Sequence, residues 1–182
     1  MKTILGKPTS LGFLFLAVCS VYACAQDASS VAKTHSGEVV FASPEQGSWR
    51  KVFYLKNGVS QKLFSGDSAY FDESEDADFS WGKKYLKVNK IIRGFLQGGG
   101  TDEEYERAYC VFIEMSSGCV VRQETGSFCG GEWASNGDAW IWGGEEIIID
   151  ERDPHKPLSD SDIERLSDIG GRENISRCIS PK

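Results

Sequence analysis

The stretch Trp49–Phe64, with the sequence WRKVFYLKNGVSQKLF, decides the fold class. At its centre is Asn57-Gly58, a dipeptide that favours the tight two-residue turn of an antiparallel hairpin. Both flanks contain β-branched and aromatic residues in the alternating pattern of strands. We therefore expect a β-hairpin formed by residues 49–55 and 59–64.

Other short β-prone segments follow along the chain, separated by polar or glycine-rich turns. A second hairpin is expected to turn at Ser116-Ser117-Gly118, and the stretch 98–104 has the composition of an exposed loop. The remaining predicted strands are Glu38–Ala42, Ala69–Phe71, Phe79–Trp81, Tyr85–Ile92, Arg107–Met115, Cys119–Gln123, a short strand at Trp133, Ala139–Trp142 and Glu145–Asp150. The sequence thus predicts a mainly β protein, with an antiparallel sheet or meander arranged as a sandwich or barrel.

After two closely spaced prolines the sequence period changes, and one short C-terminal helix is expected at about residues 159–169. Ser159 suits the N-cap position and Gly170 suits the C-terminal end of a helix. A stripe of apolar side chains at three-residue spacing, which would pack on the sheet, is formed by Ile163, Leu166 and Ile169.

Residues 1–25 have the pattern of a secretory signal peptide. Two lysines precede an apolar core at Leu11–Val18, and an Ala-x-Ala step ends at Ala25. The apolar core is shorter than the ~20 residues that a membrane-spanning helix needs. We therefore expect an exported protein, periplasmic or secreted, with a flexible polar lead at residues 26–36 and a single β-rich domain at residues 37–182.

The same N-terminal segment leaves a second form of export open. The run Val21-Tyr22-Ala23-Cys24 resembles a bacterial lipobox, in which cleavage precedes a cysteine that then carries lipid. Tyr22 departs from the small residue that is usual at that place. Soluble export is the main expectation, and the alternative is a lipoprotein anchored in the outer membrane through Cys24.

Four cysteines follow the signal segment, and an even number in an oxidising compartment indicates two disulfides. Cys110 and Cys119 stand at unequal distances from the predicted turn between them, so they are not expected to face each other. Of the three possible pairings we expect Cys119–Cys129 and Cys110–Cys178. The cysteines form no C-x-x-C spacing, and we predict neither a metal site nor a cofactor.

The formal net charge of −7 at pH 7 limits which kinds of partner are expected. An acidic exported protein attracts basic partners and repels nucleic acid, and the sequence has no basic stripe. We therefore expect a basic exported protein as the partner and no nucleic acid. Contact with a membrane is expected only through a lipid on Cys24.

An acidic run over residues 72–78 is the first candidate binding segment. It lacks the spacing and the glycine of an EF-hand, so a solvated or partner-facing loop is favoured over a calcium site. Closely packed like charges favour a basic partner that neutralises them. The predicted binding residues in this run are Asp72, Glu73, Glu75, Asp76 and Asp78.

The run Trp140–Glu146, with the sequence WIWGGEE, is the second candidate. On a strand, Trp140 and Trp142 share a face, and together with Glu145 they offer a surface for stacking and hydrogen bonding a sugar. Paired aromatic residues on strands more often belong to the core, which is the interpretation we favour. Glu132 with a glutamate of this run is a formal candidate for a glycosidase carboxylate pair.

Nucleophilic catalysis has little support in the sequence. His35 lies in the polar lead and His155 lies between prolines, so neither is placed for a Ser-His-Asp or Cys-His arrangement. Common phosphate-binding and metalloprotease motifs are absent. We therefore predict no catalytic residue and a non-enzymatic, acidic binding protein, such as an inhibitor or immunity protein for a basic cell-wall hydrolase or toxin. The alternatives are an envelope lipoprotein with a structural or assembly role and a carbohydrate-binding or glycan-cleaving protein.

Overall fold

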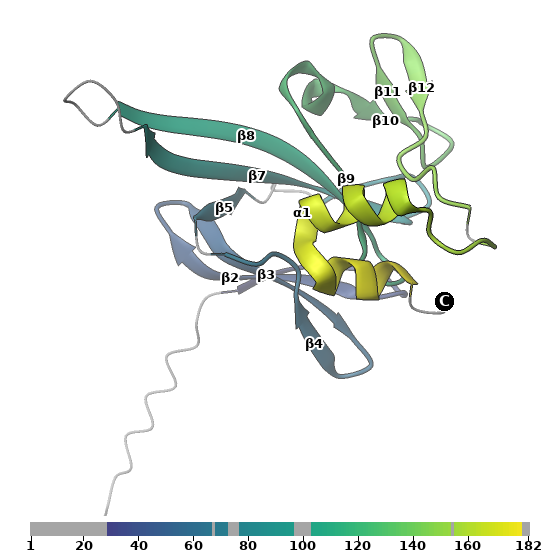
Figure 1. The fold of residues 1–182 in the computed structure, drawn as a ribbon, viewed down its shortest axis with the longest axis horizontal. Helices are drawn as coiled ribbons and strands as arrows, with labels where there is room; N and C mark the ends of the chain where they lie inside the picture. The colour runs from purple at the N-terminus through teal and green to yellow at the C-terminus, as the bar shows by residue number, and fades with distance from the viewer. Residues whose placement is uncertain (1–28, 67, 73–76, 97–102, 154, 180–182) are drawn as a thin grey trace, which may run out of the picture.

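The computed structural model describes residues 29–66, 68–72, 77–96, 103–153 and 155–179. The predicted signal peptide and Cys24 lie outside these ranges, as do Glu73, Glu75 and Asp76 of the acidic run. The described chain is mostly antiparallel β-sheet with one C-terminal helix and two disulfides (Figure 1). The predicted fold class is therefore confirmed.

Two sheets and one helix make up the described structure. In the larger sheet the strand order is β1-β2-β3-β5-β7-β8-β9, with β4 added to β3 and β6 added to β7, while β10, β11 and β12 form a small second sheet. The strands are β1 (Ser29–Lys33), β2 (Glu38–Glu45), β3 (Ser48–Lys56), β4 (Val59–Lys62), β5 (Ala69–Asp72), β6 (Asp78–Phe79), β7 (Tyr85–Leu96), β8 (Glu103–Glu114), β9 (Val120–Thr125), β10 (Glu132–Trp133), β11 (Trp140–Trp142) and β12 (Glu145–Ile147), and the helices are the 3₁₀ turn η1 (Gly126–Gly130) and α1 (Asp160–Ile179).

The predicted hairpin around Asn57-Gly58 is confirmed as β3–β4. Both turn residues have positive φ angles, 51° and 77°, as a type I′ turn requires. The opposite end of β3 pairs with β5 instead, through Trp49 and Phe71. Because β3 changes partner along its length, the sheet can bend at this strand.

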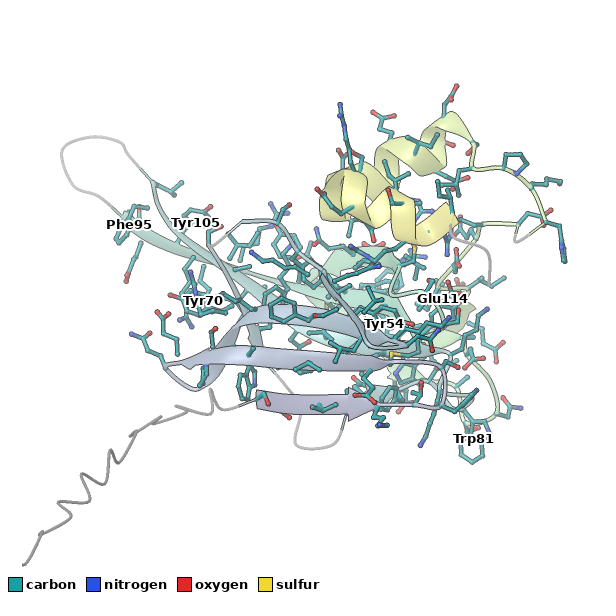
Figure 2. All side chains as sticks on the ribbon, turned by 90° about the horizontal axis from the view of Figure 1, so that it is seen from below. Tyr54, Tyr70, Trp81, Phe95, Tyr105 and Glu114 are labelled. Carbon is teal, nitrogen blue, oxygen red and sulfur yellow. A yellow bond between two sulfur atoms is a disulfide. The ribbon has the colours of Figure 1, made fainter. Side chains whose placement is uncertain are left out.

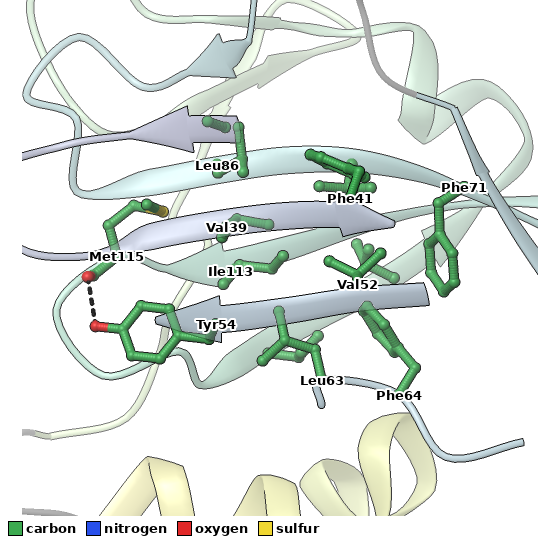
Figure 3. Packing of buried hydrophobic residues seen from close by; sticks show 14 residues of the cluster. Val39, Phe41, Val52, Tyr54, Leu63, Phe64, Phe71, Leu86, Ile113 and Met115 are labelled. Atoms are coloured by element: carbon green, nitrogen blue, oxygen red, sulfur yellow. Dashed lines mark hydrogen bonds between the residues drawn. The ribbon is translucent and has the colours of Figure 1, made fainter. Parts of the chain in front are cut away.

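The bent sheet encloses a first hydrophobic core. Tyr54 closes one end of this core, and its hydroxyl donates a hydrogen bond to the Met115 carbonyl at 2.9 Å (Figure 3). The buried side chains come from β1 to β9 and their connections, and they are Ala32, Val39, Phe41, Val52, Tyr54, Leu63, Phe64, Phe71, Leu86, Val88, Val111, Ile113, Met115 and Val120.

A second core lies on the opposite face of β7 and β8. Successive residues of β8 alternate between the two cores, so the run from Cys110 to Glu114 is buried throughout. Such double burial produces a continuous apolar run in a sequence in place of alternation. η1, the small sheet and α1 contribute to this second core, whose buried members are Tyr85, Cys110, Phe112, Cys119, Val121, Phe128, Trp140, Ile149 and Leu166.

The predicted polar lead at residues 26–36 needs correction. Ser29–Lys33 forms β1, which pairs with β2 in antiparallel register. Ala32 of this strand is 2% exposed and belongs to the first core. The segment is short and mostly small or polar, so its own composition carried little strand signal.

The predicted helix at residues 159–169 is confirmed at its start. Ser159 Oγ accepts a hydrogen bond from the Asp162 backbone amide at 3.2 Å, which is an N-cap interaction. Helical geometry is lost at Gly170 and Gly171, where φ of Gly171 is 72°. Our prediction ended there and was too short, because the chain resumes a helical path as far as Ile179.

The predicted disulfide pairing was wrong. The structure joins Cys110 to Cys129 and Cys119 to Cys178, with Cα–Cα distances of 5.4 and 4.8 Å, in place of Cys119–Cys129 and Cys110–Cys178. η1 brings Cys129 back to β8, and the missed second half of α1 carries Cys178 to the residue just before β9. Disulfides indicate an oxidising, extracytoplasmic environment. Within the described ranges, no helix has the length and apolarity to cross a membrane.

Candidate functional site

The described ends of the acidic run are held by intramolecular bonds. Ser48 Oγ donates to Asp72 Oδ1 at 2.7 Å, and Lys87 Nζ lies 2.7 Å from Asp78 Oδ2. Both aspartates are half-buried. Their charges are therefore partly compensated within the fold, while the other three predicted binding residues of this run are not described.

The structure separates the two tryptophans of the second candidate segment. Trp140 is 1% exposed, and its Nε1 donates to the Phe128 carbonyl at 2.9 Å. Trp142 is 41% exposed and stands opposite Glu145 in the β11–β12 pair. Since stacking on a sugar requires an open ring face, Trp140 does not contribute to such a platform.

A more distinctive surface is found where β7 and β8 run beyond the rest of the sheet (Figure 1). β5 pairs with β7 only as far as Ile92, and β9 pairs with β8 only from Tyr109 to Ile113. We refer to the outer part, Arg93–Leu96 of β7 and Glu103–Arg107 of β8, as the arm. Within the described chain each strand of the arm has one edge without a pairing strand.

A groove of about 780 Å³ lies between the arm and the neighbouring strands. Its centre is the ring of Tyr70, with the guanidinium carbons of Arg50 and Arg93 at 4.1 and 4.5 Å from the ring centroid. The Tyr70 hydroxyl donates to Glu45 at 3.2 Å, and Arg93 Nε donates to Glu106 at 2.9 Å. These contacts connect side chains from five strands, β2, β3, β5, β7 and β8, into one row.

The row stabilises the charged form of Arg93. The hydrogen bond to Glu106 and the charge of that carboxylate raise the pKa of Arg93 above its ordinary value. Each guanidinium also stacks on the Tyr70 ring in a cation–π arrangement. The groove therefore presents a planar, ordered surface of aromatic and guanidinium groups.

The arm itself carries exposed apolar side chains. Phe95 is 64% exposed, Leu96 56% and Tyr105 38%. Tyr105 lies across Gly94 of the opposite strand, where an added Cβ would come within 2.6 Å of the tyrosine ring. Because Gly94 has no side chain, the Tyr105 ring can lie over it across the ribbon. Aromatic side chains often cover a glycine of the neighbouring strand in this way. Figure 2 places Phe95, Tyr105 and Tyr70 at the same end of the molecule.

Two carboxylates complete the arm. Glu103 and Glu104 are exposed at its outer end, and neither forms an ion pair within the described residues. Glu106, by contrast, is bonded to Arg93. The arm thus combines apolar surface with the carboxylates of Glu103 and Glu104 and the exposed guanidinium of Arg107.

A buried group of charges lies near the other end of β8. The Arg152 guanidinium binds both Asp150 oxygens at 2.7 Å and lies 3.7 Å from Glu114, which is 2% exposed. Burial opposes the charged form of Arg152, but the bonds to Asp150 and the charge of Glu114 raise its pKa overall. Arg152 also donates to the Cys178 carbonyl. These contacts tie β8 to the end of α1 and serve the fold.

The described residues show no arrangement typical of a metal site. No group of three or more His, Cys, Asp or Glu side chains there is arranged to hold a metal ion. His35 and His155 are both exposed. Comparisons of this chain with protein-family models, with curated proteins and with solved structures find no match.

Sequence reasoning missed the arm and its groove. A usable signal was the pair Phe95-Leu96, two large apolar residues placed immediately before a polar, glycine-rich stretch. The role of Arg50 and Tyr70 had no such signal, because their neighbours are distant in the sequence.

Proposed function

We propose that this protein is an exported binding protein that engages a basic protein through the arm. It would act as an inhibitor or immunity protein for a cell-wall hydrolase or toxin. The observation that carries the proposal is the arm, a projecting two-stranded ribbon with exposed aromatic side chains and free carboxylates.

The composition of the surface supports protein binding. Tyrosine, arginine and phenylalanine are enriched at protein interfaces, and the residues that dominate binding energy are most often tryptophan, tyrosine and arginine. Tyr70, Arg50 and Arg93 are already ordered by their mutual contacts. Pre-ordered side chains lose less conformational entropy when a partner binds.

The charge of the arm supports a basic partner. Glu103 and Glu104 extend the negative charge of an acidic chain into its most exposed ribbon. Complementary charge speeds association and excludes partners of the wrong sign.

The shape of the arm supports inhibition by occlusion. Within the described ranges no strand lies beside either outer edge of the arm, and such a ribbon can enter a cleft. Blocking a cleft requires stiffness and complementarity but no catalytic group. A two-stranded ribbon is only marginally stable alone in water, so contact with a partner would also stabilise it.

The test is affinity capture with an arm variant. The oxidised protein is immobilised and exposed to envelope and secreted extracts, in parallel with Phe95→Ala/Tyr105→Ala. The unaltered protein should retain one stoichiometric basic enzyme, released by salt and inhibited again on rebinding, and the variant should bind it at least 30-fold more weakly. Val59→Ala, at an exposed site on β4, is the matched control.

Three outcomes would overturn the proposal. The first is capture that the arm substitutions leave unchanged. The second is capture of envelope assembly components only, which would favour the structural lipoprotein. The third is binding of glycans that depends on Trp142, which would favour the carbohydrate-binding alternative.

A further inference from the structure

The end of β7 opposite the arm carries another exposed aromatic residue. Trp81 lies in the turn between β6 and β7 and is 72% exposed, the largest value among the exposed large hydrophobic residues of the described chain. Figure 2 shows it far from Phe95 and Tyr105. Neither the proposed function nor the fold uses this side chain.

The backbone around Trp81 is held in place. Ser80 Oγ donates to Asp138 Oδ1 at 2.5 Å, and the Gly82 amide donates to the same oxygen at 3.2 Å. The Lys83 amide donates to the Ser80 carbonyl at 2.8 Å, which closes the turn. An indole on a fixed turn loses little entropy when it is buried by a partner.

Two exposed lysines share the turn of Trp81, and the half-buried Lys56 lies at the same end of the sheet. Lys83 and Lys84 are exposed in the same turn. The Lys84 carbonyl accepts from the Met115 amide at 2.8 Å, while Lys56 Nζ donates to the next carbonyl, that of Ser116, at 2.6 Å. The three lysines therefore lie at one end of the sheet, and none of them forms an ion pair within the described residues.

The acidic groups near this end are held by the fold. Asp138 accepts the two bonds of the turn from neutral donors, which orient its carboxylate without cancelling its charge, whereas Glu114 is 2% exposed and lies beside Arg152. At physiological ionic strength the Debye length is about 8 Å, so the more distant carboxylates of the chain are largely screened. Trp81, Lys56, Lys83 and Lys84, which we name the Trp81 end, combine an exposed indole with the two exposed ammonium groups of Lys83 and Lys84.

We propose that the Trp81 end docks on an anionic phospholipid bilayer. Tryptophan favours the interface of a bilayer, where its ring meets the acyl chains and its N–H meets the headgroups. Each lysine near an anionic leaflet strengthens binding about fivefold. The acidic remainder of the chain is repelled by such a surface. Binding is therefore favourable in the orientation that places the Trp81 end on the lipid and the arm away from it.

The experiment measures vesicle binding by co-sedimentation, with the protein purified as its host exports it. Vesicles of phosphatidylglycerol are compared with vesicles of phosphatidylcholine, because a lipid on the chain would not distinguish the two. The protein should prefer the anionic vesicles, and Lys83→Gln/Lys84→Gln should reduce that preference about 30-fold. Lys51→Gln, at an exposed lysine of β3, should leave it unchanged.

A second readout tests insertion of the indole itself. Phosphatidylglycerol with brominated chains should quench part of the tryptophan fluorescence, and Trp81→Phe should abolish this quenching. Phe95→Ala, which removes an exposed aromatic ring at the arm, should not reduce vesicle binding.

Three results would overturn the proposal. They are equal binding to neutral and anionic vesicles, a preference unaffected by the lysine substitutions, and binding to a soluble anionic polysaccharide as strong as to vesicles without quenching. None of these results bears on the arm, so this proposal and the proposed function can fail separately.

Discussion

The two ends of the β7–β8 hairpin share one unbroken antiparallel register but differ completely in their surroundings. At the inner end, the side chains from Cys110 to Glu114 are at most 2% exposed. At the outer end, every residue from Glu103 to Ala108 is exposed. Backbone pairing is the same at both ends, so the difference comes from the layers packed against the ribbon. Buried contacts are concentrated at the inner end, and the outer end is exposed.

Removing the disulfides should cause the largest loss of stability, because both bridges lie at or beside the inner end. Loop-closure entropy gives about 4 kcal/mol for Cys119–Cys178 and about 3 kcal/mol for Cys110–Cys129, from sequence separations of 59 and 19. Denaturant unfolding with and without reductant measures the loss. An unchanged midpoint in reductant would show that the inner end does not depend on the bridges.

Phe112→Ala should destabilise the protein by about 3–5 kcal/mol, the usual range for truncating a buried phenylalanine. Phe112 is fully buried and contacts the rings of Phe128, Trp133 and Trp140. The matched variant Phe95→Ala removes the same atoms from the arm and should change the free energy of unfolding by less than about 0.5 kcal/mol. Equal losses in the free energy of unfolding of the two variants would show that the two ends contribute equally to stability.

Alkaline pH should weaken the first core through Tyr54. Burial, assisted by the charge of Glu114, raises the pKa of Tyr54 to about 12. An unfolded tyrosine ionises near pH 10, so the unfolded chain loses this proton first and stability falls as the pH rises from about 10 to 12. Below pH 10 both states keep the proton and the contribution is intact.

Tyr54→Phe provides the control for this pH dependence. The wild-type protein should lose about 2–3 kcal/mol more than the variant between pH 10 and 12, measured from denaturant midpoints. Parallel curves for the two proteins would show that Tyr54 does not carry the effect.

Shortening the arm should have only a small effect on stability. In the variant, residues 94–105 are replaced by Asn-Gly, which supports a two-residue hairpin turn. The free energy of unfolding should change by less than about 1 kcal/mol, because exposed segments contribute little to it. Capture of the basic partner should disappear. A large loss of stability would mean that the arm belongs to the structural part of the hairpin.

Local signals explain which parts of the fold were predictable. The β3–β4 hairpin follows from Asn57-Gly58 alone, and the start of α1 follows from the capping residue Ser159. Both depend on residues that are adjacent in the sequence. β1 was missed because its strand state depends on pairing with β2, and its own residues are mostly small or polar.

The candidate site was less predictable because its parts meet only in three dimensions. The arm exists because β5 and β9 end before the outer ends of β7 and β8. The point at which a neighbouring strand stops pairing cannot be predicted from a local sequence pattern. The contacts of Tyr70 with Arg50 and Arg93 likewise join three separate strands. Composition did indicate correctly that two disulfides form, but their partners depend on η1 and on the second half of α1.

The interleaved order of the disulfides has a consequence for biosynthesis. In a chain that emerges N-terminus first, Cys110 and Cys119 appear before Cys129 and Cys178, and the finished protein does not join the first two. Any early bridge between Cys110 and Cys119 would have to be exchanged before the native pairs can form. Thiol–disulfide exchange performs such corrections in seconds to hours, depending on the available catalyst. We therefore expect a disulfide isomerase, in addition to an oxidant, to raise the yield of correctly paired protein.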